Sequence, residues 1–161
     1  KSVADALNTA DILKKVKVLH ESLKNDFGIT NPKIALLGLN PHAGDGGLLG
    51  EEEQTVIQPA IDQANALGIN AFGPFPADGF FGSSRFKDYD GILGMYHDQG
   101  LIPFKAASFG TGVNFTAGLP IIRCSPDHGT AYDIAGKGLA DERSMHEAIE
   151  MALAIVAKRR S

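Results

Sequence analysis

The feature that most constrains this chain is a repeated arrangement in which an apolar run ends abruptly in polar residues. The run GILGMY at residues 91–96 leads directly into a histidine, an acid and an amide at residues 97–99, with Lys105 shortly after. A second run, IALLGL at residues 34–39, leads into a glycine-rich segment that contains His42. Buried parallel strands are near-continuous apolar runs, and α/β proteins place site residues where such strands end. The sequence therefore predicts an α/β fold in which two strand ends share one site.

Helical and strand-like patterns alternate along the rest of the chain. Apolar residues at helical spacing predict helices over residues 10–26, 51–67 and 145–158. The strands that we expect between and after them cover residues 33–39, 69–72, 91–96 and 121–124, and the glycine-rich residues 109–118 fit an extra hairpin or arm. This alternation predicts a mixed, largely parallel sheet flanked by helices.

Composition limits the possible partners and the compartment. A chain of 161 residues is long enough for one α/β domain, predicted over residues 1–161. Its formal net charge of −4 offers no basic stripe for nucleic acid. No apolar stretch approaches the ~20 residues of a membrane span. The single cysteine, Cys124, is typical of a reducing, cytoplasmic compartment. Because the chain begins at Lys1 and not at a methionine, we expect it to be a fragment of a longer protein.

His42 and His97 are candidate metal ligands. A lone histidine in such a loop more often caps the backbone, but two of them with acids nearby favour a metal. Catalytic metal sites usually take about three protein ligands, so a third is needed. Asp45, Asp78 and Asp98 are candidates within the chain, and an upstream residue or a second subunit is an equal alternative. Asp78, which precedes a glycine, is also a typical turn residue.

The segment DHGTAYDIAGKG at residues 127–138 is a candidate nucleotide-binding loop. Its glycines allow close approach of a ligand, and Asp133 and Lys137 offer polar contacts. By composition alone this signal is weak, and a loop with an N-capped short helix is the better interpretation. No Gly-x-Gly-x-x-Gly motif follows a first strand, so a dinucleotide would have to bind in another way than in the Rossmann fold.

Four segments together carry a resemblance to a known family. They are NPHAGDGG at residues 40–47, GPFPADGFF at residues 73–81, YHDQGLIPFK at residues 96–105 and the loop at residues 127–138. The chain resembles the 4-hydroxythreonine-4-phosphate dehydrogenase family over nearly all of its length. The segment around His128 also resembles the adenine-side loop of the isocitrate and isopropylmalate dehydrogenase superfamily, which binds NAD without the Rossmann fingerprint. The implied fold is one half of such a dehydrogenase, the later half of a longer chain.

The resemblance implies a role for each matching position. His42 and His97 correspond to two of three ligands of a divalent metal (Zn, Mg, Mn or Co), and the third is expected just upstream of Lys1. Lys105 and Asp78 are both candidates for the general base. The residues that correspond to substrate contacts are Lys105, Asn114 and Arg123, and those of the NAD loop are His128, Gly129, Thr130, Asp133 and Lys137. Without the resemblance, Lys105 and Arg123 would be interpreted as surface cations and Asn114 as a turn residue.

The implied activity is the oxidation of 4-phosphooxy-L-threonine by NAD or NADP, followed by decarboxylation to 3-amino-2-oxopropyl phosphate, in the synthesis of pyridoxal 5′-phosphate. The resemblance also implies a homodimer that shares the active site. Because the missing half would carry the third metal ligand and further substrate-binding residues, the isolated fragment is expected to be inactive. Two alternatives stay open. The parent protein could be a related dehydrogenase of 4-phospho-threonate or 4-phospho-erythronate in sugar-acid catabolism, or the chain could be a non-catalytic NAD-binding or dimerisation fragment.

Overall fold

The structure, a computed structural model, describes residues 2–108 and 110–160. It divides into two compact units, Lys1–Leu101 and Ile102–Ser161, and the division falls inside helix α4 (His97–Ser108). The single domain expected over residues 1–161 stays a prediction. None of the described helices is long and apolar enough to cross a membrane.

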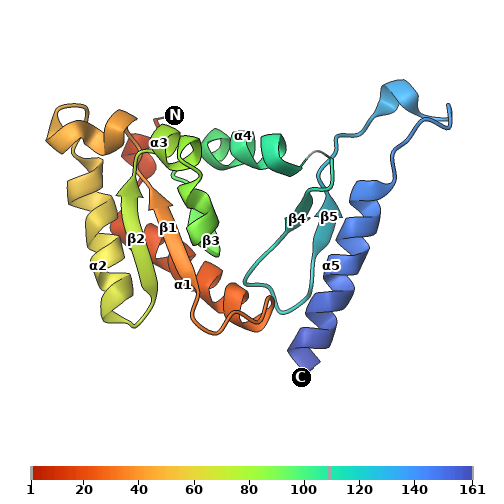
Figure 1. Cartoon of the computed structure of the whole chain (residues 1–161), viewed down its shortest axis with the longest axis horizontal. Coiled ribbons are helices and arrows are strands. Elements are labelled where there is room, and N and C mark those ends of the chain that lie inside the picture. The colour runs from red at the N-terminus through yellow and green to blue at the C-terminus, as the bar shows by residue number, and fades with distance from the viewer. Residues whose placement is uncertain (1, 109, 161) are drawn as a thin grey trace. The chain divides into compact units, whose positions relative to one another are not determined.

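A parallel sheet of three strands forms the centre of the first unit. Strand β1 (Lys33–Leu37) lies between β2 (Asn70–Phe75) and β3 (Gly91–Leu93), as Figure 1 shows. The register places Ile34 opposite both Ala71 and Gly91. Since β1 is hydrogen-bonded on both edges, it is the most protected strand, and this explains why its sequence is almost entirely apolar. The predicted parallel sheet is confirmed.

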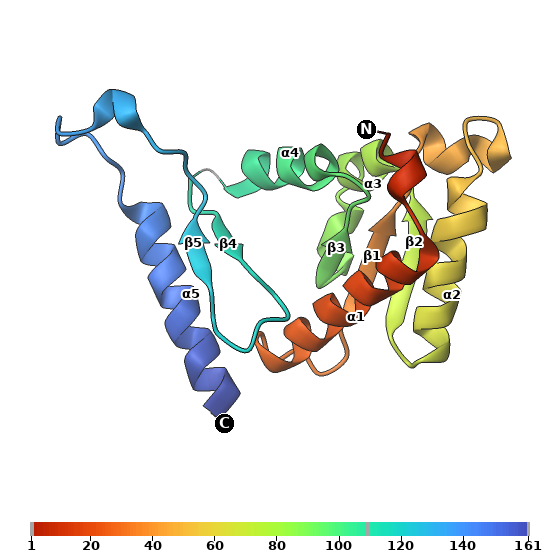
Figure 2. The same ribbon diagram turned by 180° about the vertical axis from the view of Figure 1, so that it is seen from behind.

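Alternate residues of β1 are buried on opposite faces of this sheet. Ile34 and Leu36 pack into a core formed with helices α1 (Thr9–Asn25) and α2 (Gln58–Ala66). Figure 2 shows these two helices from behind. Ala35 and Leu37 pack on the other face against Phe80 and its aromatic neighbours. These aromatic residues come from β2, from helix α3 (Ala77–Gly82), from the 3-10 turn Arg85–Asp88 and from Tyr89 directly after it. Both faces of β1 are therefore covered, which fixes the position of its carboxyl end.

Two elements of the first unit differ from the predicted bounds. The helix expected over residues 51–67 begins as a π-helix, Glu53–Ile57, because Pro59 has no N–H to continue an α-helical ladder. The Gln58 N–H instead donates to the Glu53 carbonyl. The strand expected over residues 91–96 ends at Leu93, since the Met95 N–H donates to the side chain of Gln99 at 2.7 Å. A short 3-10 turn, Ala4–Ala6, precedes α1.

The second unit consists of a β-hairpin and a long helix. Strands β4 (Val113–Phe115) and β5 (Cys124–Pro126) are antiparallel, and helix α5 (Arg143–Arg160) packs along them (Figure 1). Residues 109–118, which fit an extra hairpin or arm by sequence, supply only the first strand of this hairpin, and Phe109 lies outside the described residues. The strand predicted over residues 121–124 was placed too early and begins only at Cys124. Ile149 on α5 is 49% exposed.

Candidate functional site

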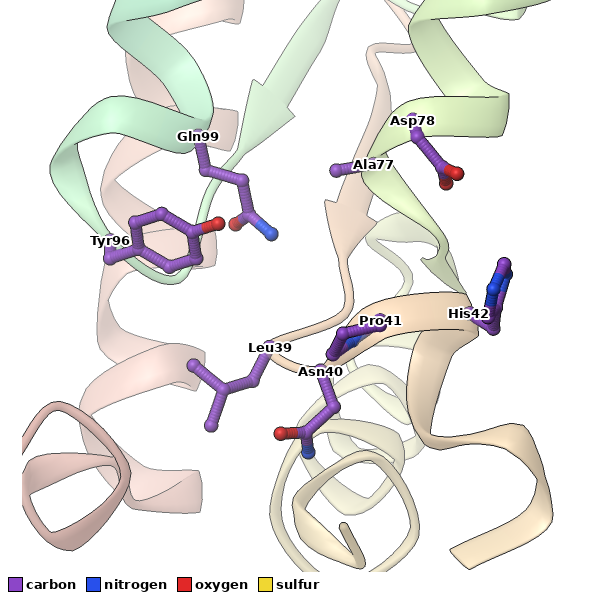
Figure 3. Close-up of a pocket in the computed structure, with 8 residues that line it drawn as sticks. All are labelled: Leu39, Asn40, Pro41, His42, Ala77, Asp78, Tyr96 and Gln99. Atoms are coloured by element: carbon purple, nitrogen blue, oxygen red, sulfur yellow. The ribbon is translucent and has the colours of Figure 1, made fainter. Parts of the chain in front are cut away.

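A cavity of about 280 Å³ lies where strands β1 and β3 end. It is lined by Leu39, Asn40, Pro41, His42, Ala77, Asp78, Tyr96 and Gln99. Figure 3 shows three segments converging on it, with His42 and Asp78 on one side and Tyr96 and Gln99 on the other. Residues that follow two apolar strands therefore meet at one cavity, although His97 is not among those that line it.

His42 lies in an unusual turn after β1. The turn covers Pro41–Gly47, and the backbone of His42 has a φ of 53°, in the left-handed region. The imidazole is exposed and lies on the same side of the cavity as Asp78, which is in the first turn of α3. This places one predicted metal ligand and one predicted general base at the same cavity wall.

His97 is the first residue of α4 and follows Tyr96, which lines the same cavity. Its side chain is 80% exposed, and its Nδ1 lies 2.8 Å from the Asp98 carboxylate. A carboxylate bonded to one ring nitrogen orients a histidine and leaves the other nitrogen available to a metal. In this geometry Asp98 is suited to orient His97 and less suited to bind the metal itself.

The donor set of this edge fits part of a divalent-metal site. Two exposed imidazoles are suitable ligands for zinc, manganese or cobalt, and Asp78 adds a carboxylate at the cavity. Within residues 2–108 and 110–160, however, no three His, Cys, Asp or Glu side chains are grouped as a metal-binding set. None of the three in-chain candidates therefore completes a shell with the two histidines in this structure.

Gln99 connects the two strand ends that carry the histidines. Its side chain is only 8% exposed, donates to the Gly38 carbonyl after β1 and accepts from the Met95 N–H after β3. Both halves of its amide are therefore used in fixing the cavity wall. The sequence identified Gln99 only as an amide in the motif, and its double role depends on contacts between distant segments.

Asn40 is a second cavity residue whose role the sequence did not reveal. Its backbone N–H and its side-chain amide donate to the carboxylates of Glu52 and Glu53. The hydrogen bond from Asn40 is the main cause that lowers the pKa of Glu52. Tyr96 stands at the start of a quoted motif, but only the structure shows that it lines the cavity.

The predicted substrate-binding residues lie in the second unit. The Lys105 ammonium lies 3.7 Å from the Asp127 carboxylate, and the exposed Arg123 guanidinium donates to the Thr116 hydroxyl at 2.9 Å. Asn114 is exposed on β4, opposite Ser125 of β5. Asp127 was expected only as the start of the nucleotide loop, and its pairing with Lys105 is a new feature.

The predicted NAD loop is exposed from His128 to Lys137 except at Ile134. His128 Nδ1 lies 2.9 Å from the Gly129 carbonyl, and the chain then turns through Ala131, whose φ is 49°, into the 3-10 turn Tyr132–Ile134. A Cβ atom at Gly129 would meet no atom within 4 Å. The loop thus has open space for a ligand, with Thr130, Asp133 and Lys137 at its exposed surface.

These features define an α/β protein with polar side chains at the carboxyl ends of parallel strands and a separate glycine-rich loop. Residues 1–152 match the model of one family, described as pyridoxal phosphate biosynthetic protein PdxA. The chain belongs to the PdxA family.

Individual relatives agree with this assignment. The chain is 55% identical over 159 residues to a 4-hydroxythreonine-4-phosphate dehydrogenase of Bacteroides thetaiotaomicron, covering 99% of this chain and 44% of the relative. A crystal structure of the Klebsiella pneumoniae enzyme of that name superposes with a TM-score of 0.84 at 45% identity, covering 95% of this chain and 46% of the other. A terephthalate 1,2-cis-dihydrodiol dehydrogenase of Burkholderia xenovorans is similar at 30% identity with a TM-score of 0.74, covering 94% and 48%. The chain spans about half the length of these relatives.

Proposed function

We propose that this chain is the later half of an NAD- and divalent-metal-dependent dehydrogenase that oxidises 4-phosphooxy-L-threonine in the synthesis of pyridoxal 5′-phosphate. The observation that carries the proposal is the cavity at which His42, Asp78 and the segment leading to His97 converge. Relatives of about half identity over nearly the whole chain bear the name of this dehydrogenase. That family implies a nicotinamide cofactor and a metal.

In this proposal His42 and His97 hold the metal together with a ligand from outside the described residues. Asp98, bonded to His97 Nδ1, keeps the ring oriented. When bound, a divalent metal supplies positive charge that lowers the pKa of the substrate alcohol. The same ligands could bind Zn, Mg, Mn or Co, so they do not determine which metal is used.

The chain's own residues bind and orient the substrate. Lys105 and Arg123 suit its phosphate or carboxylate, and Asn114 suits a hydroxyl or amine because it both donates and accepts. Lys105 or Asp78 takes the alcohol proton while the hydride on the same carbon passes to NAD. The resulting β-keto acid loses carbon dioxide, and protonation of the remaining enol gives 3-amino-2-oxopropyl phosphate.

The exposed loop from His128 to Lys137 is the proposed NAD site, with Gly129 and Thr130 near the adenine and Asp133 and Lys137 as polar contacts. We further propose that the protein acts in the cytoplasm as a homodimer whose subunits share the active site. NADP stays an alternative cofactor, since the loop offers Lys137 to an additional phosphate.

The test is NADH production by the full-length enzyme with divalent metal on three substrates in parallel: 4-phosphooxy-L-threonine, 4-phospho-threonate and 4-phospho-erythronate. We expect preference for the amino substrate. Preference for a sugar acid would support the second candidate, a related dehydrogenase of sugar-acid catabolism. If none of the three substrates yields NADH, and calorimetry shows NAD binding that does not depend on metal, both dehydrogenase proposals are contradicted. That result would favour a non-catalytic NAD-binding module.

A further inference from the structure

The turn that carries His42 has a backbone that L-amino acids rarely adopt in succession. Residues 42–46 all have positive φ angles, between 43° and 83°. Only two of these five residues are glycines, and the others are His42, Ala43 and Asp45. Left-handed backbone is disfavoured for residues with a Cβ and normally occurs one residue at a time. Contacts from elsewhere in the fold must therefore hold this turn.

The buried side chain of Glu53 supplies these contacts. Glu53 begins the π-helix and is only 3% exposed. Its Oε1 accepts the backbone N–H of Asn40 at 2.7 Å, and its Oε2 accepts the Asn40 side-chain amide at 3.0 Å. Both bonds reach the residue at the entrance of the turn, two positions before His42.

The glycines on either side of this carboxylate show how closely the turn fits around it. A Cβ atom at Gly44, inside the turn, would lie 2.7 Å from Glu53 Oε2. At Gly38, after β1, it would lie 3.0 Å from Oε1. The carboxylate therefore fills the space between the end of β1 and the inner side of the turn, and no other residue type fits at Gly44 without a shift.

We propose that Glu53 is a positioning residue for His42: its buried carboxylate holds the left-handed turn and thereby directs the imidazole toward the cavity. Figure 3 shows His42 and Asn40 on the segment in question. The inference rests on the proposed function, in which His42 holds a metal. Glu53 itself does not line the cavity. Its effect passes through the backbone, as expected of residues that orient ligands from outside the coordination shell.

The test uses Glu53→Gln in the full-length enzyme, with Glu51→Gln as the matched control. Glutamine preserves the size of the side chain and one acceptor, but its amide nitrogen would face the Asn40 amide nitrogen, donor against donor. Glu51 is an exposed neighbour in the same acidic run. Both proteins are stripped of metal and titrated with Co²⁺ by calorimetry, and the visible absorption of bound Co²⁺ reports the ligand geometry.

We expect Glu53→Gln to weaken Co²⁺ binding by about 10- to 100-fold and to change the Co²⁺ absorption, while Glu51→Gln stays near wild type. The affinity for NADH, measured by fluorescence, should not change. A purely structural role would lower the thermal midpoint without changing Co²⁺ affinity or absorption in the folded protein. That result would overturn the inference.

Two further outcomes are informative. If Glu53→Gln does not fold, the comparison is repeated in an Ala43→Gly background, because glycine relieves the left-handed backbone at that position independently of Glu53. The same loss of Co²⁺ affinity is expected there, and equal affinities would contradict the inference. If the wild-type enzyme binds no Co²⁺, the proposed metal site itself is wrong. If wild type and variant bind Co²⁺ equally well, the metal site stands and only the role of Glu53 is wrong.

Discussion

His97 projects into solvent at the start of α4, but Asp98 restrains its ring by a 2.8 Å contact to Nδ1. We predict that His97→Ala abolishes turnover of the full-length enzyme and removes most of its metal affinity. Asp98→Asn should weaken metal binding less, by about 10- to 100-fold, because the ligand remains but loses its orienting charge. Calorimetric titration with Co²⁺ and NADH formation measure the two effects. His146→Ala, an exposed histidine on α5, is the control, and full activity of metal-free His97→Ala would contradict the assignment.

Lys105 is the other residue whose role can be tested directly. Its ammonium lies 3.7 Å from Asp127, and both groups are partly open to solvent. We predict that Lys105→Met lowers kcat/KM by about 10²-fold or more if the lysine transfers a proton, since general acid–base catalysis is of that size. Asp127→Asn should have a smaller effect, because an ion pair this exposed contributes little. Steady-state kinetics decide, with the exposed Lys24→Met as control.

At the scale of elements, Ser144 connects α5 to the hairpin. Its buried hydroxyl donates to the Gly112 carbonyl at 2.9 Å and accepts the Asp127 N–H at 3.0 Å. Ser144→Ala leaves both groups without this partner, so we predict a loss of about 1–3 kcal/mol in the free energy of unfolding. Ser83→Ala is the matched control, an exposed serine that also donates to a carbonyl. Urea denaturation measures both, and equal losses would show that burial is not the cause.

The start of α5 has a second, pH-dependent contact. The Arg143 side chain hydrogen-bonds to Asp141 and lowers the pKa of that carboxyl from 3.8 to about 2. Because the folded-state pKa is lowered, the stabilisation is present above about pH 4 and is lost as the pH falls toward 2. We therefore predict that Asp141→Asn lowers the thermal midpoint at neutral pH, and that its difference from wild type narrows below pH 4. Glu150→Gln, exposed on the same helix, should show no such convergence in circular dichroism melts.

Sequence patterns predicted best the helices and strands whose buried residues follow a regular spacing or a continuous run within the element itself. The apolar run of β1 and the helical spacing of α1 correspond closely to the observed elements, because each buries one continuous face or run. The hardest element was the left-handed turn Pro41–Gly47. Its glycines indicate a loop, but its conformation depends on Glu53, 13 residues beyond Asn40, and one acid in a run of three gives no signal of its own.

In the candidate site too, motifs identify candidate residues, whereas their hydrogen bonds and ion pairs can be known only from the structure. The histidines and Asp78 are candidates because they stand in the motifs, and the structure places His42 and Asp78 at one cavity. Gln99 and Asp127 also stand in motifs, yet their bonds to Gly38 and Lys105 depend on residues far away in the sequence. Residues that position a site are therefore the ones that periodicity and composition identify least well.

At the scale of the whole molecule, the chain spans about half the length of its relatives, and its described residues group no three metal ligands. Metal affinity rises with the number of ligands held in place, and catalytic sites need about three. We therefore predict that this chain, produced alone, forms no NADH from 4-phosphooxy-L-threonine and binds Co²⁺ more weakly than the full-length enzyme. In the full-length enzyme, metal and phosphorylated substrate should each strengthen binding of the other, because both approach the same histidines. Paired calorimetric titrations, with and without the second ligand, measure this coupling. Turnover by the isolated chain at a rate near that of the full-length enzyme would mean that a complete site lies within these residues, and the third ligand would then have to be one of its own acids.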